Sequence, residues 1–169
     1  MMNVICGTTI YPLEDIINKY NGMLYRLAII RMQNKEDAEE VVQDTFVKLI
    51  EHIQKKKSFN DEEHLKAWLL TVATNRSKSI LTLYWNKNTE GMDGLKDFAA
   101  PEQKDNYALD YVLKLPEKYK VAIYLFYYEQ LTTEQIAVVM KTKEATVRSY
   151  LHRGREKLKT MMEAETNVG

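Results

Sequence analysis

Residues 132–155 read TTEQIAVVMKTKEATVRSYLHRGR, and this stretch decides the fold expected of the second half of the chain. Thr132-x-x-Gln135 is the pattern of a capping box, which predicts a helix that ends at about Met140. A three-residue turn follows, and a second helix rich in Arg and Lys begins at Glu144. Two helices with this spacing are typical of a helix-turn-helix, in which the second helix reads duplex DNA.

The apolar residues of this stretch fall on the faces that would pack the two helices together. They are Ile136, Ala137 and Met140 in the first helix and Val147, Tyr150 and Leu151 in the second. Arg and Lys occupy outer positions of the second helix, where they can contact phosphates. Lys141 stands in the turn where Gly is most frequent, and a left-handed conformation would cost it about 1 kcal/mol. A helical hairpin with a solvated basic face is the alternative interpretation.

The composition of the whole chain favours helices. Its 169 residues include only 6 Gly and 3 Pro, too few for a fold that turns often. A single Cys excludes an internal disulfide, and with three His it excludes the usual zinc site of four ligands. The longest apolar run is residues 121–128, far shorter than the roughly 18 residues that span a membrane. The N-terminus lacks a signal-peptide pattern, so we expect a cytoplasmic protein without membrane insertion.

Apolar residues recur at helical spacing along most of the chain. The helices that this spacing predicts cover residues 11–32, 35–53, 61–85, 107–115, 117–128, 132–140 and 144–162. Residues 86–106 have no such period and contain five acids, which indicates a linker. The predicted fold is therefore all-α, with two small helical domains, residues 1–85 and 107–169, joined by this linker.

Charge is divided unevenly along the chain, although Lys and Arg together equal Asp and Glu at 24 each. Residues 36–51 hold six acids and one base, whereas residues 141–160 hold seven bases and two acids. An acidic helix and a basic helix in one chain indicate two different partners.

The acidic helix is predicted to have two faces. At roughly 100° per residue, the inner side receives Ala38, Val42, Thr45, Leu49 and Ile53. The outer side receives Glu36, Glu40, Gln43, Asp44, Val47 and Glu51. Carboxylates around an apolar residue favour the docking of a basic partner. A solvated helix face with one exposed Val is the alternative.

The sequence offers little for catalysis or metal binding. Di-iron helical bundles need Glu-x-x-His pairs, and His52, His64 and His152 supply none. Asp61-x-x-His64 lies at a predicted helix start, where acids commonly serve as caps. Cys6 is expected in a loose N-terminal segment without a neighbouring base. We therefore predict no enzymatic activity, no catalytic residues, no bound metal and no cofactor.

Several motifs follow one another in a characteristic order. They are DAEEVVQDTF (residues 37–46), AWL (67–69), LP (115–116), EQIA (134–137) and TVRSYLHRGR (146–155). In this order they resemble the extracytoplasmic-function (ECF) group of bacterial RNA polymerase sigma factors. The resemblance covers residues 11–85 and 107–161, nearly all of the chain outside the linker.

The resemblance implies an activity and its partners. Residues 1–85 would form the sigma region 2 domain, which binds core RNA polymerase and melts the minus-ten promoter element. Residues 107–169 would form the region 4 domain, which reads the minus-thirty-five element and binds the polymerase flap. Such a factor directs the polymerase to promoter DNA. An anti-sigma protein, which could hold the factor at the membrane, would control it.

The resemblance also implies roles for individual residues. The clamp helices of the largest polymerase subunit would contact Glu40, Gln43, Asp44 and Val47. The minus-ten strand would contact Lys55, Lys56, Lys57, Phe59, Asn75, Arg76 and Lys78. The minus-thirty-five duplex would contact Lys143, Glu144, Thr146, Arg148, Ser149, His152 and Arg153. Trp68, and Trp85 in part, are expected in the core.

The sequence departs from the family at three positions of the predicted minus-ten helix. Ser79 stands where an acid is common, and Thr82 and Asn86 stand where Arg is common. This helix is therefore poor in charge, which predicts weaker promoter contacts or an altered sequence preference.

Two other functions compete with the sigma-factor reading. An ordinary helix-turn-helix regulator would bind a palindromic DNA site as a dimer, without polymerase. A helical adaptor would bind proteins only. Neither function accounts for the order of the motifs.

Overall fold

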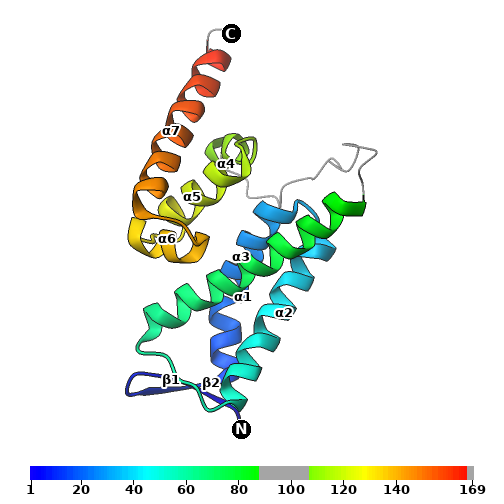
Figure 1. Ribbon diagram of the computed structural model, residues 1–169, viewed down its shortest axis with the longest axis vertical. Helices are drawn as coiled ribbons and strands as arrows, with labels where there is room; N and C mark the ends of the chain where they lie inside the picture. The colour runs from blue at the N-terminus through cyan, green and yellow to red at the C-terminus, as the bar shows by residue number, and fades with distance from the viewer. Residues whose placement is uncertain (88–106, 167–169) are drawn as a thin grey trace. The chain divides into compact units, whose positions relative to one another are not determined.

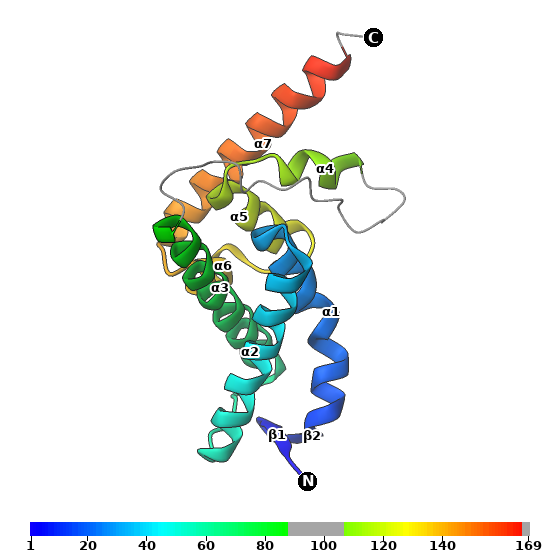
Figure 2. The same cartoon turned by 90° about the vertical axis from the view of Figure 1, so that its right-hand side faces the viewer.

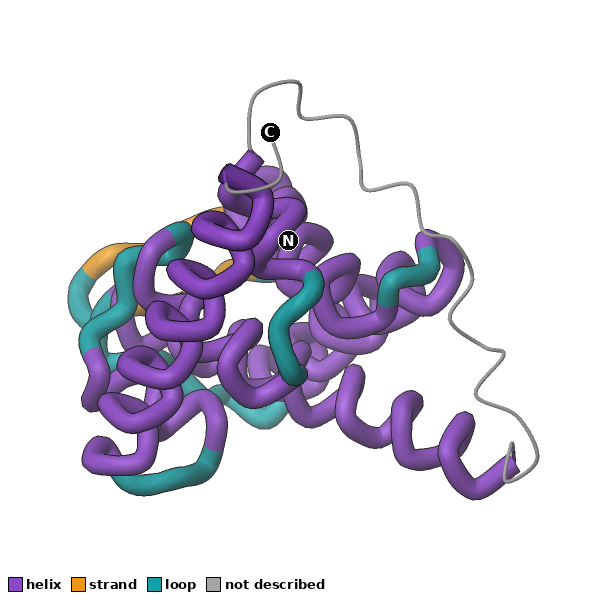
Figure 3. The backbone as a smooth tube through the Cα atoms, turned by 90° about the horizontal axis from the view of Figure 1, so that it is seen from above, coloured by secondary structure: helices purple, strands orange, loops and turns teal. Residues whose placement is uncertain are grey.

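The computed structural model describes residues 1–87 and 107–166 (Figure 1). The chain divides into two compact units, Met1–Lys96 and Asp97–Gly169. The prediction was all-α with two domains; most of the described chain lies in helices (Figure 3), so the helical class and the two domains are confirmed. The predicted linker, residues 86–106, lies outside the described residues except for residues 86 and 87, which belong to a helix.

The first unit combines a β-hairpin with helices. The hairpin pairs β1 (Asn3–Cys6) with β2 (Thr9–Pro12) in antiparallel orientation. Helices α1 (Leu13–Met32), α2 (Lys35–Gln54) and α3 (Glu62–Lys87) each pack against the other two. Figure 2 shows the hairpin beside the start of α1. The core between the helices includes Ile16, Leu24, Leu27, Ala38, Val41, Leu49, Leu65, Leu69 and Leu70.

The hairpin is the main departure from the predicted fold. Cys6 was expected in a loose segment, but it is buried in β1, where it is 5% exposed. Burial raises the pKa of the Cys6 thiol, so the thiol stays protonated and packs as a small apolar group.

Side-chain caps fix where two helices of the first unit begin. The Asn34 side chain accepts hydrogen bonds from two backbone N–H groups in the first turn of α2. At α3 the capping side chain is Asp61. Asp61 accepts a hydrogen bond from the backbone of His64 at 2.7 Å, and His64 Nδ1 accepts one from the backbone of Asn60 at 3.0 Å. The Asp61–His64 pair is therefore a helix cap.

Glu62 joins three elements at the start of α3. Its carboxylate accepts hydrogen bonds from Tyr11 of β2 at 3.3 Å and from Tyr20 of α1 at 2.7 Å, and it pairs with Lys19. The Lys19 ammonium and the Tyr20 hydroxyl hold the pKa of Glu62 below its ordinary value of 4.5. The charged form of Glu62 therefore stabilises the packing of the hairpin and α1 on α3.

We expect Glu62→Gln to lower the free energy of unfolding of the first unit at neutral pH. The difference from the unaltered chain should become smaller at acidic pH. Because the folded-state pKa lies below the unfolded-state value, the carboxylate contributes stability above pH about 4.5. That contribution is lost as the pH falls through the folded-state pKa. Urea unfolding followed by tryptophan fluorescence measures it, since both tryptophans, Trp68 and Trp85, lie in this unit. Glu63→Gln, at an exposed neighbour, is the control; a deficit independent of pH would contradict the expectation.

The second unit is built around its last helix. Helices α4 (Tyr107–Leu113), α5 (Glu117–Tyr127) and α6 (Thr133–Met140) all pack against α7 (Glu144–Thr166). The core contains Val112, Leu115, Val121, Ile123, Leu125, Ile136, Val139, Val147 and Leu151. Helix α7 continues to Thr166, four residues beyond its predicted end.

Gly154 allows α7 to lie very close to α5. A Cβ atom at this position would be 2.9 Å from Ile123 Cγ1 and 3.5 Å from Tyr119 Cβ. The first distance is shorter than real side-chain contacts allow, so the glycine permits the helices to approach. The same helix then carries the polar residues of the predicted recognition surface on its outer side.

Candidate functional site

Helix α2 turns an apolar side into the first unit and a carboxylate-rich side outward. Its buried residues are Ala38, Val41, Val42, Thr45, Phe46 and Leu49. On the other side Glu40, Gln43 and Val47 are exposed and Asp44 is half-buried. These four residues are called the acidic face below. Val47 is 51% exposed, which places an apolar spot among the carboxylates.

Arg76 of α3 reaches the acidic face. Its Nε donates a hydrogen bond to Asp44 Oδ2 at 2.5 Å, and its Nη2 donates one to Glu40 Oε1 at 3.1 Å. These carboxylates raise the pKa of the guanidinium, Asp44 most strongly. The guanidinium of Arg76, which the resemblance assigns to DNA contact, is therefore bound to α2 within the domain.

The C-terminal end of α3 exposes apolar side chains. Leu83 and Trp85 are 55% and 72% exposed, so the expectation that Trp85 lies partly in the core is wrong. Tyr84 donates a hydrogen bond to Asp37 Oδ1 at 3.1 Å, close to the start of α2. That carboxylate raises the pKa of the Tyr84 hydroxyl. The C-terminal end of α3 therefore lies beside the start of α2, with Leu83 and Trp85 left exposed.

The loop between α2 and α3, residues 55–61, presents lysines to solvent. Lys55, Lys56 and Lys57 are all exposed, and Lys56 adopts a left-handed conformation with φ of 58°. Lys78 is exposed on α3, and Asn75 is half-buried there. At a rise of about 1.5 Å per residue, Lys78 lies roughly 24 Å along α3 from its start. The predicted minus-ten residues are therefore spread along a surface rather than gathered in one cluster.

Phe59 is a correction to the predicted DNA-binding set. Phe59 is only 2% exposed. Its ring stacks on the His52 ring with 4.6 Å between the ring centroids, and it lies edge-to-face with the Trp68 ring at a centroid distance of 5.4 Å. Burial, assisted by the nearby Lys57 charge, lowers the pKa of His52, so the imidazole is neutral in this cluster at pH 7. Phe59 thus closes the core beneath the loop and offers no face to a base.

The second unit contains the predicted helix-turn-helix. Thr132 and Gln135 form a capping box at the start of α6, as predicted. Lys141 ends that helix in the left-handed conformation, with φ of 54° and ψ of 49°. Across the turn the Thr133 hydroxyl donates a hydrogen bond to Glu144 Oε1 at 2.8 Å, which ties α6 to the first turn of α7.

The outer side of α7 and the turn residue just before it, Lys143, carry the residues predicted to read duplex DNA. Lys143, Arg148, His152 and Arg153 are exposed, and Glu144, Thr146 and Ser149 are half-buried. Arg148 donates a hydrogen bond to Glu144 Oε1 at 2.6 Å. The Thr133 hydroxyl and Arg148 lower the pKa of Glu144, so this carboxylate is ionised and orients the guanidinium. His152 lies 3.2 Å from Glu156, one turn further along.

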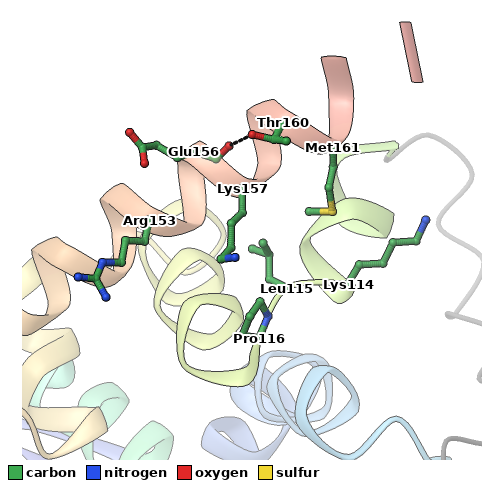
Figure 4. A pocket seen from close by; sticks show the side chains of 8 residues that line it. All are labelled: Lys114, Leu115, Pro116, Arg153, Glu156, Lys157, Thr160 and Met161. Atoms are coloured by element: carbon green, nitrogen blue, oxygen red, sulfur yellow. Dashed lines mark hydrogen bonds between the residues drawn. The ribbon is translucent and has the colours of Figure 1, made fainter. Parts of the chain in front are cut away.

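A shallow pocket of about 500 Å³ lies between α7 and the α4–α5 connection (Figure 4). Its charged lining is mostly cationic, with Lys114, Arg153 and Lys157 around Leu115 and Pro116. Figure 4 shows Lys157 extending toward Leu115, whereas the Glu156 carboxylate points away from it. The basic surface of α7 therefore continues beyond the recognition residues.

Two features are absent from the described residues, 1–87 and 107–166. No three His, Cys, Asp or Glu side chains in these ranges are grouped closely enough to hold a metal ion. Within the same ranges, no helix is both long and apolar enough to cross a membrane.

Two family models match the chain. The Sigma-70 region 2 model matches residues 16–85, and the Sigma-70 region 4 model matches residues 106–158. The first match spans the three helices of the first unit apart from the first three residues of α1 and the last two of α3. The second covers α4 to α6 and the first two thirds of α7.

The chain is also similar to named proteins over most of its length. It is 30% identical to the ECF RNA polymerase sigma-E factor of Haemophilus influenzae, over 86% of this chain and 82% of that protein. It is 28% identical to the ECF sigma factor SigW of Bacillus subtilis, over 88% and 87%.

Two solved structures share the fold. One is the sigma factor RpoE of Bartonella quintana in complex with the anti-sigma factor NepR, with a TM-score of 0.73, 23% identity, and coverage of 89% of this chain and 96% of that one. The other is CnrH in complex with the cytosolic domain of CnrY, with a TM-score of 0.62, 18% identity, and coverage of 90% and 88%.

Proposed function

The chain belongs to the ECF group of RNA polymerase sigma factors, and we propose that its acidic face binds the clamp helices of the core enzyme. As a sigma factor, it initiates transcription by directing core RNA polymerase to specific promoters. Glu40 and Asp44 beside the exposed Val47 suit a basic partner surface with an apolar centre. The strongest support is the outward placement of these residues opposite a fully buried side of α2.

The minus-ten element would be bound as a single strand by the first unit. Lys56 and Lys57 in the loop and Lys78 on α3 supply cations for the phosphates, and Asn75 supplies an amide for a base edge. Arg76 is paired with Glu40 and Asp44, and Phe59 is buried. This surface therefore offers DNA fewer charged and aromatic side chains than the sequence predicts. Ser79, Thr82 and Asn86 are exposed neutral residues, which fits an altered promoter preference.

The minus-thirty-five element would be bound as a duplex by α7, with α6 against the backbone. Arg148, held by Glu144, is placed near the start of α7, where a recognition helix meets base edges. Arg153 and Lys157 lie further along and suit phosphates. The second unit would also bind the polymerase flap.

We expect Arg148→Ala with Arg153→Ala to reduce transcription about tenfold from a promoter that depends on its upstream element. One base-contacting guanidinium and one phosphate contact are removed, and a loss of about 1.4 kcal/mol is tenfold. The promoter is a duplex selected from a random pool with the unaltered holoenzyme. Lys35→Ala with Lys159→Ala removes the same charge from exposed positions elsewhere and is the control. Unchanged output from the Arg variant would reject α7 as the reading helix.

An anti-sigma protein would control this factor. The structurally similar sigma factor RpoE is solved with an anti-sigma factor, and CnrH is solved with the cytosolic domain of CnrY. We propose that the chain works in the cytoplasm and could be held at the membrane by its partner. The bond-making chemistry of transcription would stay in the polymerase, so the chain itself would be no enzyme.

Co-elution of the purified chain with core RNA polymerase in size exclusion, without DNA, tests the proposal. A one-to-one complex is the expected result. A folded chain that binds palindromic duplex DNA tightly and ignores the polymerase would instead be an ordinary helix-turn-helix regulator.

A further inference from the structure

The β-hairpin is an addition to the part of the chain that the family model covers. The Sigma-70 region 2 match begins at residue 16, after both strands. The hairpin is nevertheless firmly attached, because Val4 and Cys6 are 1% and 5% exposed. The backbone N–H of Leu13 also donates to the carbonyl of Met2 at 3.0 Å, which ties the beginning of β1 to α1.

The hairpin binds the loop of residues 55–61 through the backbone. The Phe59 N–H donates to the Ile5 carbonyl at 2.8 Å, and the Gly7 N–H donates to the Phe59 carbonyl at 2.8 Å. Cys6 and Phe59 form a parallel bridge. Both polar backbone groups of Phe59 are therefore satisfied by β1 and its turn, and the loop residue extends the hairpin by one bridge.

Gly7 is the residue that permits this contact. It has a φ of +61°, which other residues rarely adopt, and a Cβ on it would lie 2.8 Å from the Asn60 carbonyl oxygen. The obstacle is backbone rather than a flexible side chain. A side chain at position 7 would therefore push the loop away from the hairpin.

Two side-chain contacts reinforce the same junction. The Phe59 ring is buried against His52 and Trp68, which turns the end of the loop inward. The Tyr11 hydroxyl of β2 donates to Glu62 in the first turn of α3. The loop is thus held at its last residues, while Lys56 and Lys57 remain exposed at its beginning.

We propose that the N-terminal hairpin is a positioning element, which holds the loop in the conformation that captures the unpaired minus-ten strand. This inference rests on the proposed function of Lys56 and Lys57 as strand contacts. A loop already ordered by the hairpin loses less conformational entropy when DNA binds, so the strand binds more tightly. Gly7 and Phe59 act through the loop and touch no DNA.

The test compares four full-length chains, each assembled with core polymerase: the unaltered chain, Gly7→Ala, Thr8→Ala and Lys56→Ala with Lys57→Ala. The probe is a fluorescent single-stranded DNA selected from a random 12-nucleotide pool with the unaltered holoenzyme. Anisotropy measures the Kd for this probe. Hydrogen exchange at the Phe59 and Asn60 amides measures the attachment of the loop. Thr8, exposed in the same turn, is the control position.

We expect Gly7→Ala to speed exchange at the Phe59 amide and to raise the Kd about tenfold, with core affinity unchanged and Thr8→Ala neutral. Faster exchange with an unchanged or lower Kd would overturn the hairpin's positioning role while the lysine variant still confirms the loop as a strand contact. Unchanged exchange would also overturn it. If the double lysine variant binds the probe normally, the proposed function of the loop fails and this inference fails with it.

Should Gly7→Ala misfold, Val4→Ala replaces it. This change removes a buried hairpin side chain but introduces no clash with the loop. The same combination of faster Phe59 exchange and weaker probe binding is expected, and the same outcomes overturn the inference.

Discussion

A chain carrying Glu40→Lys and Asp44→Lys will bind core RNA polymerase about 100-fold more weakly than the unaltered chain, and will not co-elute with it at micromolar concentration. Both carboxylates lie on the acidic face, beside the exposed Val47. Close charge pairs across interfaces are coupled by about 1.5 kcal/mol or more each, and reversing the sign adds repulsion. Titration of labelled chain with core enzyme measures the loss.

Matched variants separate this effect from net charge and from misfolding. Glu14→Lys with Glu63→Lys makes the same change in net charge at exposed positions on α1 and α3. Since the lysines at 40 and 44 would also face Arg76, tryptophan fluorescence must show that the first unit remains folded. Normal core affinity in a folded Glu40→Lys, Asp44→Lys chain would exclude the acidic face as the docking surface.

Gly154→Leu will destabilise the second unit by about 3 kcal/mol, the upper part of the range for overpacking. The new side chain must enter the space of Ile123 and Tyr119, where even a Cβ would approach within 2.9 Å of Ile123 Cγ1. Better helix propensity offsets less than about 1 kcal/mol of this cost. Hydrogen exchange of the α5 and α7 amides measures the change in opening free energy.

Gly22→Leu is the control for this substitution. Gly22 also lies within a helix, but a Cβ there meets only the end of the Arg26 side chain, at 3.2 Å. This variant should be as stable as the original or slightly more stable. In Gly154→Leu, the fluorescence transition of the first unit should not move. Equal protection of α5 and α7 in the two leucine variants would show that the close approach at Gly154 is unimportant.

The helices were predictable because each has a strong local signal. The apolar period of α2 correctly separates buried Ala38 and Leu49 from exposed Glu40 and Val47. The capping box at Thr132 likewise marks the start of α6. Such signals act within one or two turns of helix, where sequence spacing and spatial distance agree.

The sequence also contains a signal for the hairpin, which the all-α prediction did not include. Residues 3–12 read NVICGTTIYP, in which buried Val4 and Cys6 alternate with exposed residues up to a two-residue turn that begins with Gly. Alternation around such a turn is typical of a hairpin.

The surroundings of two predicted site residues, Phe59 and Arg76, depend on distant parts of the chain. The backbone of Phe59 is hydrogen-bonded to a strand and turn more than fifty residues earlier, and Arg76 pairs with a carboxylate 32 residues away. Nothing in their local sequence distinguishes them from a loop aromatic and a helix-surface cation. Only the tertiary packing of α2, α3 and the hairpin decides what these two side chains contact.

The pairing of Arg76 with Glu40 and Asp44 determines how many positive charges a partner of the acidic face needs. A partner protein with a single cation only replaces Arg76 as the counter-ion, so it gains little binding free energy. A partner protein with several suitably spaced cations can pair with both carboxylates in place of Arg76, and it also gains contact with Val47. Arg76 therefore competes with any partner for these two carboxylates. This competition disfavours weakly basic proteins and favours a partner surface with an extended array of positive charge.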